Sequence, residues 1–190
     1  MRSLFIKCNT CLVAIDELIQ HLSHCVPVDE RERESIATFL AVVPTLADPF
    51  NEHAGPVHIT ASGIVVSDDA TKTALHLHKR LNMWLQPGGH IEPGESPADG
   101  ALRESHEEIG VPVRHQTEGG LLVHLDVHPG PKGHTHLDLR YLVRAPETVP
   151  QPAHGESTQV GWFTWAEAQA MADAGLVGAL RAVNALLGKD

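Results

Sequence analysis

The chain has 190 residues, 42% of them hydrophobic, and a formal charge of −10. This length favours one domain with a small extension and is sufficient for a buried core. The negative charge argues against a nucleic-acid polymer as the main partner, because binding along a phosphate backbone needs a basic surface. No apolar run approaches the roughly 20 residues of a membrane span, and the N-terminus has no convincing signal cleavage site. We therefore expect a cytoplasmic protein without a membrane partner.

Residues 1–54 are predicted to form a helical N-terminal extension. An apolar stripe of helical spacing indicates a helix over residues 11–25. Asp29, followed three residues later by Glu32, forms a capping pair that opens a second helix. Residues 44–56 are rich in turn formers and are typical of a connection. Two helices this short are marginal alone, so their apolar faces need a partner, which is either the same chain or a second copy in a homodimer.

All three cysteines lie in this extension. An odd number in a chain without an export signal argues against a disulfide framework. Cys8-x2-Cys11 followed by His21, His24 and Cys25 has a superficial likeness to a zinc site. The apolar helical stripe through the same segment favours a helix with partly exposed histidines instead. Zinc analysis of the purified protein would decide between the two.

Residues 55–190 change to a strand pattern. Residues 58–67 and 71–80 are predicted to form a hairpin around the turn at Asp68-Asp69. Further strands are expected at 121–127, 137–143 and 160–163, and closing helices at 165–173 and 176–187. Strands, one acidic helix, more strands and closing helices indicate an α/β or α+β layered domain.

The acidic helix carries unusual charge. Ser96 is a good N-cap and Gly110 a good C-terminal residue. Within the helix, Glu104, Glu107 and Glu108 stand at i, i+3 and i+4 and share one face. Like charges at this spacing repel each other, and the end of the helix dipole disfavours negative charge. A divalent cation such as Mg²⁺ or Mn²⁺ would compensate, although a solvated acidic helix end is the alternative.

The surrounding residues carry a resemblance. The segment Gly89-x5-Glu95-x7-Arg103-Glu104-x2-Glu107-Glu108-x-Gly110-Val111 resembles the signature of the Nudix hydrolases, pyrophosphatases that act on nucleoside diphosphates linked to another group. Ser105 stands where the family carries an aliphatic residue. Because Ser105 belongs to the packing face, the departure affects stability more than chemistry, and its hydroxyl can bond back to the carbonyl four residues earlier. The resemblance implies a mixed sheet between helices.

The resemblance also implies roles for the residues. Glu104, Glu107 and Glu108 would be the metal ligands, with the Gly88 carbonyl as an addition, and Gly89 would let the backbone approach the diphosphate. Arg103 and Glu95 would form a supporting ion pair. One or more Mg²⁺ or Mn²⁺ ions would promote attack of water at phosphorus. The proton acceptor stays open between Glu107, Glu108, Asp138 and Glu156, because family members place this base on different loops.

Polar residues also alternate along a later strand. His136, Asp138 and Arg140 share one face, and His76 and His78 repeat this pattern earlier in the chain. We interpret this face as part of the substrate cleft, where His136 and Asp138 would reach a phosphate-bound metal and Arg140 would pair with phosphate. A solvent-facing sheet surface is the alternative.

The nucleobase is not specified by the sequence. Trp84, Trp162 and Phe163 could stack on a base, but each has a packing role to fill. We therefore expect a small phosphorylated nucleotide-type substrate of undefined base. Two rival functions are a nucleotide-sensing module without turnover and a metal-dependent isomerase of the same fold. The intact acidic residues argue against the first, and the absence of cysteine from residues 55–190 argues against the second.

Overall fold

A computed structural model describes residues 9–188, with side chains from residue 15 onward. Its helices are α1 (Asn9–Leu22), α2 (Glu30–Val42), α3 (Pro97–Ile109), α4 (Trp165–Met171) and α5 (Ala174–Leu186), with short 3-10 turns at Val43–Thr45 and Pro131–Gly133. Its strands are β1 (Val57–Ser67), β2 (Lys72–His78), β3 (Met83–Leu85), β4 (Gly88–His90), β5 (Arg114–His115), β6 (Leu121–Pro129), β7 (Thr135–Ala145) and β8 (Val160–Thr164).

The strands form one mixed sheet, and this confirms the predicted fold class. β1 lies at its centre, parallel to β7 over its whole length and antiparallel to β2 and β4. β7 in turn pairs antiparallel with β6 and β5, while β2 pairs antiparallel with β8 and β3. The predicted β1–β2 hairpin is confirmed. The short strands β3, β4 and β5 were not expected from the sequence.

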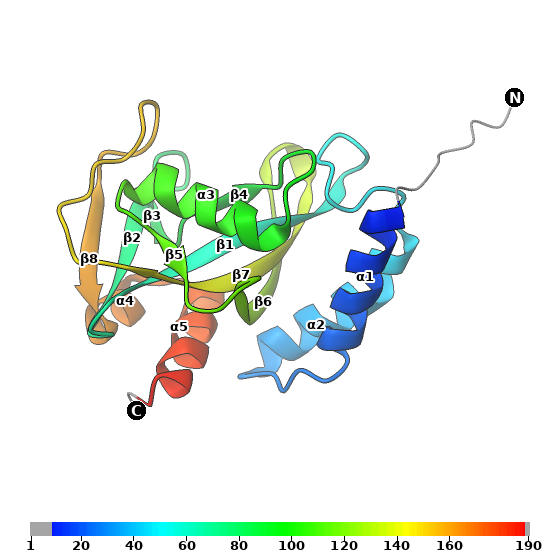
Figure 1. The fold of residues 1–190 in the computed structure, drawn as a ribbon, viewed down its shortest axis with the longest axis horizontal. Helices are drawn as coiled ribbons and strands as arrows, with labels where there is room; N and C mark the ends of the chain where they lie inside the picture. The colour runs from blue at the N-terminus through cyan, green and yellow to red at the C-terminus, as the bar shows by residue number, and fades with distance from the viewer. Residues whose placement is uncertain (1–8, 189–190) are drawn as a thin grey trace, which may run out of the picture.

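Helices cover both faces of this sheet (Figure 1). On one face, Ala101 and Ile109 of α3 are fully buried in the core. On the other, Leu176 and Leu180 of α5 pack against Ile64 of β1. No helix in the described part of the chain is long and apolar enough to cross a membrane.

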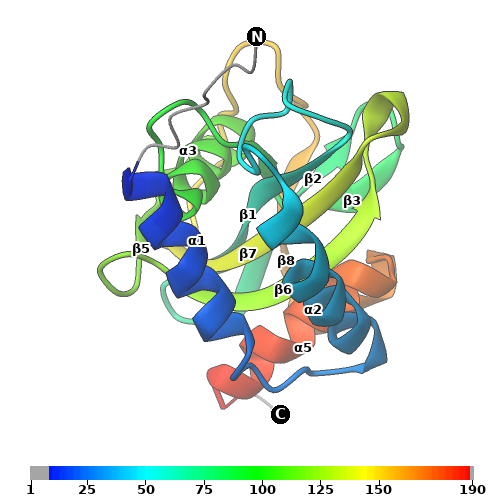
Figure 2. The same ribbon diagram turned by 90° about the vertical axis from the view of Figure 1, so that its right-hand side faces the viewer.

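The N-terminal helices pack beside β6, as Figure 2 shows from the side that they cover. Leu22, Ile36 and Phe39 belong to the same buried cluster as Leu125 and Leu137 of the sheet. The partner of these apolar faces is therefore the same chain. One half of the predicted capping pair is confirmed, because the Asp29 side chain accepts from the backbone N–H of Glu32 at 3.0 Å. The Glu32 carboxylate does not complete the pair: it accepts from the backbone N–H of Val28 at 2.7 Å.

Candidate functional site

Helix α3 begins and ends where the sequence indicates. The Ser96 hydroxyl accepts a hydrogen bond from the backbone N–H of Asp99, and Pro97 occupies the first turn. Gly110 ends the helix in the left-handed conformation at φ +71°, which favours glycine. The buried side of α3 is made of small residues and Ile109, and the adjoining side directs Glu104 and Glu108 at the Gly88-Gly89 backbone.

Arg103 organises the acidic side of α3. Its guanidinium donates to both carboxylate oxygens of Glu95, at 3.0 and 3.1 Å, and to the His90 carbonyl at 2.9 Å. It also donates to Glu104 at 2.8 Å and to Glu107 at 3.3 Å. These contacts raise the pKa of Arg103, with the Glu95 hydrogen bonds as the largest cause. A single cation therefore holds the preceding loop against the helix and reaches two of the three glutamates.

Glu108 is the third glutamate, and it lacks a cationic partner of this kind. Its side chain is only 13% exposed. The carboxylate accepts from the Gly88 backbone N–H at 2.8 Å, and His76 lies 3.6 Å away. Burial, followed by repulsion from Glu104 and other acids, raises the pKa of Glu108 to about 8. Burial also raises the pKa of Glu104, although Arg103 opposes this shift.

The two glycines before α3 allow β4 to lie very close to its neighbours. A Cβ added to Gly89 would stand 2.5 Å from a carboxylate oxygen of Glu104, and one added to Gly88 would overlap the Ser62 side chain. The absence of a Cβ at Gly88 therefore lets this backbone lie close to β1, and its absence at Gly89 leaves room for the Glu104 carboxylate. The Gly88 amide donates to Glu108, so the first residue of β4 contacts the acidic helix.

Polar residues of two strands stand in register across the sheet. Along the parallel β1–β7 pair, His58 is opposite His136, Thr60 is opposite Asp138, and Ser62 is opposite Arg140. Side chains in register on neighbouring strands project to the same face. Further along β1, the alternate positions Ile64 and Val66 are apolar and lie under α5. This face of β1 is therefore apolar at Ile64 and Val66 and polar from Ser62 back to His58.

Asp138 and Arg140 are buried in a network of their own. Asp138 accepts from the hydroxyls of Thr60 and Ser62 and from Nε of Arg140 at 2.9 Å. Burial would raise the pKa of this carboxyl, but Arg140 and the other donors hold it below its usual range. The remaining two nitrogens of Arg140 donate to the Gly175 carbonyl at 2.7 Å and to Asp126 at 3.1 Å. All three nitrogens of the guanidinium are thus already engaged.

A cleft of about 950 Å³ opens over this polar face. Glu108, Gly88 and Gly89 line one part of it, and Asp138 and Arg140 line the part over the sheet. Besides Arg140, three cations line this cleft that sequence reasoning did not identify: Arg31 from α2 and the neighbours Lys79 and Arg80 after β2. Other lining residues include His76, His78, His90, His128, His136, Asp126 and Glu156.

Arg31 and Asp126 were missed because no local pattern connects them. Arg31 Nε donates to Asp126 at 2.6 Å across 95 residues of sequence. Burial alone would raise the pKa of Asp126, but hydrogen bonds from His128 and Arg31 and the charge of Arg140 hold it well below its usual range. The alternation of His124, Asp126 and His128 along one strand was the available signal.

The three aromatic residues considered for base stacking lie elsewhere. Trp84 and Phe163 contact each other at a centroid distance of 4.9 Å within an apolar cluster, and the Trp162 indole donates to the Thr148 carbonyl. None of the three is among the residues that line the cleft in the described part of the chain.

The possible zinc site in the extension is only partly visible. Cys8 lies outside the described residues, and the side chain of Cys11 does too. Cys25 is a half-buried free thiol whose sulfur donates to the His21 carbonyl at 3.6 Å, and His24 bonds the Gln20 carbonyl. These contacts are those of a helix end.

Comparisons with known proteins agree with this architecture. The sequence profile of the NUDIX domain matches residues 57–183. A probable DHNTP pyrophosphohydrolase from Lactococcus lactis subsp. cremoris is 29% identical over 143 residues, which cover 70% of this chain and 80% of that protein. A NUDIX-family hydrolase structure from Clostridium perfringens is 26% identical with a TM-score of 0.58, covering 68% of this chain and 97% of its own. An Ap4A hydrolase from C. elegans, 22% identical with a TM-score of 0.53 over 70% of this chain and 98% of its own, shares the fold.

Proposed function

The chain belongs to the NUDIX-domain family and is a hydrolase of phosphoanhydride bonds, and on this premise we propose that its substrate is a nucleoside diphosphate linked to another group. The observation that carries the proposal is the meeting of Glu108 and the Gly88-Gly89 backbone at one side of the cleft. The charges of Arg31, Lys79 and Arg80 at the same cleft suit a small substrate with several phosphates. In a chain of net charge −10, this local cationic group supports a small anionic ligand rather than a polymer.

We propose that the acidic side of α3 holds Mg²⁺ or Mn²⁺. The residues fit such an ion: the donors are hard carboxylate oxygens, and burial and the neighbouring acids raise the pKa of Glu108 to about 8. Glu104, Glu107, Glu108 and the Gly88 carbonyl would hold the ion. When bound, it would offset the charge of the diphosphate and activate water for attack at phosphorus.

The chain's own residues would position the reaction. Arg103 fixes the loop through Glu95 and the His90 carbonyl, so the Gly89 backbone is held beside the phosphates. Arg140 and Asp138 neutralise each other, so we propose that they shape the wall of the cleft and orient Ser62 and Thr60, with direct phosphate contact left to Lys79 and Arg80. His136 shares the same wall and is a candidate for substrate contact.

Among the four candidate bases we favour Glu156. Asp138 is engaged by hydrogen bonds from Thr60, Ser62 and Arg140, and its depressed pKa makes it a weak proton acceptor. Glu107 and Glu108 belong to the proposed ligand set. Glu156 lines the cleft and lies near enough to raise the pKa of Glu108, so it faces the site from a separate loop.

A substrate panel tests the proposed activity. Nucleoside triphosphates, dinucleoside polyphosphates and nucleotide sugars should be assayed with Mg²⁺, with Mn²⁺ and with EDTA, in water enriched in ¹⁸O. We expect metal-dependent cleavage of a phosphoanhydride bond with ¹⁸O incorporated into a phosphate product. Turnover that persists in EDTA would contradict the metal mechanism. Tight binding without turnover across the panel would favour the nucleotide-sensing alternative.

The variant Glu108→Gln tests the proposed ligand. It keeps the shape of the side chain but removes its charge, so we expect kcat to fall at least about 10²-fold, as for other electrostatic catalytic groups. Glu118→Gln, an exposed glutamate of a surface loop, is the matched control and should keep the parent rate. Glu156→Gln and Glu107→Gln distinguish a base from a metal ligand. If the residue is the base, the lost rate should recover at high pH. If it is a ligand, a higher metal concentration should be required for half-maximal activity. An unchanged rate for Glu108→Gln would remove it from the site.

A further inference from the structure

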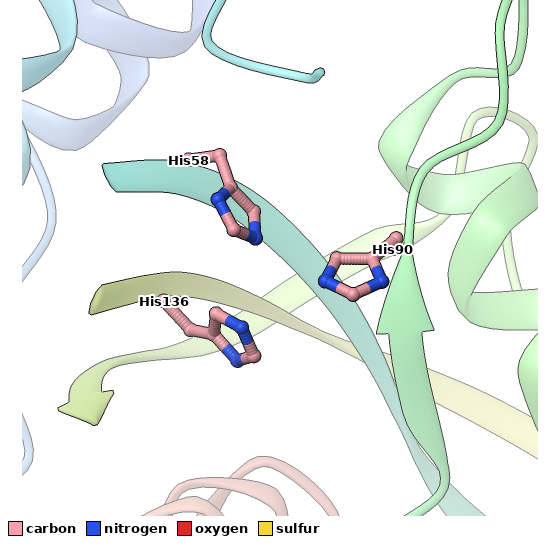
Figure 3. A group of neighbouring side chains, drawn as sticks. All are labelled: His58, His90 and His136. Carbon is pink, nitrogen blue, oxygen red and sulfur yellow. The ribbon is translucent and has the colours of Figure 1, made fainter. Parts of the chain in front are cut away.

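A group of histidines lies beside the signature loop, the segment from Gly88 to Ser96 that precedes α3. It forms a group separate from the glutamates of α3. Nitrogen atoms of His58, His90 and His136 lie within 4.8 Å of one another. The three residues come from β1, β4 and β7, and their rings point toward a common space (Figure 3). Their ring centroids are 5.0 to 5.5 Å apart. In the part of the chain that the structure describes, this is the one group with ligand atoms so close together.

Three ring nitrogens of this group are buried without a hydrogen-bond partner among the described residues. His58 is fully buried, yet neither of its ring nitrogens has a hydrogen-bond partner of good geometry, and Nε2 of His136 is also buried without one. A buried polar group without a partner costs about 1–3 kcal/mol. Such atoms at the meeting point of three imidazoles indicate a missing ligand rather than a packing function.

We propose that His58, His90 and His136 bind a transition-metal dication of the Zn²⁺ class, at a site separate from the carboxylates of α3. Three imidazole nitrogens without a carboxylate suit zinc and its neighbours and do not suit Mg²⁺. A fourth ligand would be water or an anion, as in other three-ligand zinc sites.

The surroundings of the group suit imidazole ligands. Burial lowers the pKa of all three histidines, and that of His136 falls to about 4 by burial followed by the charges of His128, His58 and His90. Neutral imidazole is the form that binds metal. The Gly55 backbone partly opposes the lowering of the His58 pKa. The Glu52 carboxylate lies 3.5 Å from Nδ1 of His90, which is the arrangement that orients many metal-bound histidines.

The position of the site gives it an entry path and a consequence. His90 and His136 line the cleft, whereas His58 closes the site from behind. His90 also follows Gly89 directly, and its carbonyl is held by Arg103. An ion bound here would therefore tie the signature loop to β1 and β7 and would be loaded from the cleft.

Zinc titration of the full-length chain tests the proposal. Replacement of Cys8, Cys11 and Cys25 by Ser removes the thiolates, and excess Mg²⁺ occupies the carboxylates of α3. In this background we expect calorimetry to show one equivalent of Zn²⁺ and a rise in Tm on zinc addition. With Co²⁺ as a spectroscopic probe, visible bands of a nitrogen-ligated ion should appear and then disappear when Zn²⁺ is added.

Variants locate the ion. His136→Ala and His90→Ala should each weaken Zn²⁺ binding at least about 10²-fold, since removing even an outer partner of a ligand costs 10–100-fold. The half-exposed His90 serves if His136→Ala does not fold, as judged by circular dichroism. Glu52→Gln should weaken binding about 10-fold. His154→Ala, an exposed histidine outside the group, should bind as the parent does.

Two results would overturn the site. If Glu108→Gln abolishes zinc binding, the ion occupies the acidic side of α3. If the His90 and His136 variants bind zinc as tightly as the parent does, the histidines are not ligands. Either result would leave the proposed hydrolysis standing, because zinc binding is measured without substrate. A failed substrate panel would likewise leave the zinc site intact.

Discussion

Ser105 shows how one residue adapts the signature helix to this sheet. Its hydroxyl donates to the Ala101 carbonyl at 2.6 Å, so the buried polar atom is satisfied within the helix. The same oxygen fills the space in front of Gly63 on β1, where an added Cβ would overlap it. A serine at this aliphatic position is therefore matched to a glycine on the neighbouring strand, and the chemistry of the glutamates is left untouched.

This pairing predicts the effect of Gly63→Ala. The added methyl group would meet Ser105 and also stand 3.1 Å from Val143, so we expect a loss of about 1–3 kcal/mol in the free energy of unfolding. In the Ser105→Ala background the loss should be smaller, because the overlapping oxygen is gone. Urea unfolding of the four proteins of this double-mutant cycle measures the coupling. Strictly additive effects would mean that the two residues do not constrain each other.

At the scale of elements, α2 protects the free edge of the sheet. β6 pairs with β7 on one side only within the described sheet, and exposed edges of this kind invite association. Glu32 of α2 accepts from the Leu125 backbone N–H at 3.1 Å, and Ser35 accepts from that of Val127 at 3.1 Å. Arg31 adds the ion pair to Asp126 between them. The helix thus supplies side-chain acceptors where a further strand would supply carbonyls.

Glu32→Ala tests this edge contact. The substitution removes the acceptor of two backbone N–H groups, those of Val28 and Leu125, so we expect a loss of about 1–3 kcal/mol in the free energy of unfolding. Glu32→Gln retains an acceptor oxygen and should lose less. Glu34→Ala, an exposed glutamate of the same helix, is the control. Chemical denaturation gives the three values, and equal losses for Glu32→Ala and Glu34→Ala would contradict the role of Glu32.

Elements with local signals could be predicted, and those defined by distant pairing could not. Helix α3 follows from Ser96, Pro97 and Gly110, because capping is decided within a few residues. β4 is three residues long and contains two glycines, so it is a strand only because β1 lies beside it. Likewise, the spacing in sequence does not relate His58 to His90 or His136. The sequence predicted a polar face on β7, whereas the histidine group also needed the register of β1.

At the scale of the molecule, the extension and the sheet share one core. Phe39 and Val43 are almost fully buried together with Ile59 and Leu139. The extension also lends Arg31 to the cleft. The boundary proposed between residues 54 and 55 therefore separates elements that are packed as one unit, and we expect a single unfolding transition for the chain.

The stability of the whole molecule in acid depends on His124, which lies where β6, α5 and α2 meet. It is 1% exposed, a Cβ added to Gly178 of α5 would stand 2.7 Å from its Nε2, and Asp29, the N-cap of α2, is close enough to act on its pKa. Burial, followed by the charge of Arg140, lowers the pKa of His124 to about 4. The unfolded chain, where the pKa is near 6.5, therefore takes up the proton first as pH falls. The stabilisation is complete above about pH 6.5 and is lost as pH falls toward 4, by up to about 3 kcal/mol.

Substitution of His124 by Leu should remove this part of the pH dependence. We expect the free energy of unfolding of His124→Leu to fall less than that of the parent between pH 6.5 and 4, when both are measured by urea denaturation in EDTA. His76 and His136 titrate in the same window with pKa values of about 4, so both proteins keep a residual slope that the difference between the two curves cancels. The pKa of Asp126 is held well below its usual range, so its contribution is lost mainly below about pH 4 and cancels in the same difference. The exposed His154→Leu is the control, and parallel curves for parent and His124→Leu would show that the packing of three elements does not depend on a neutral His124.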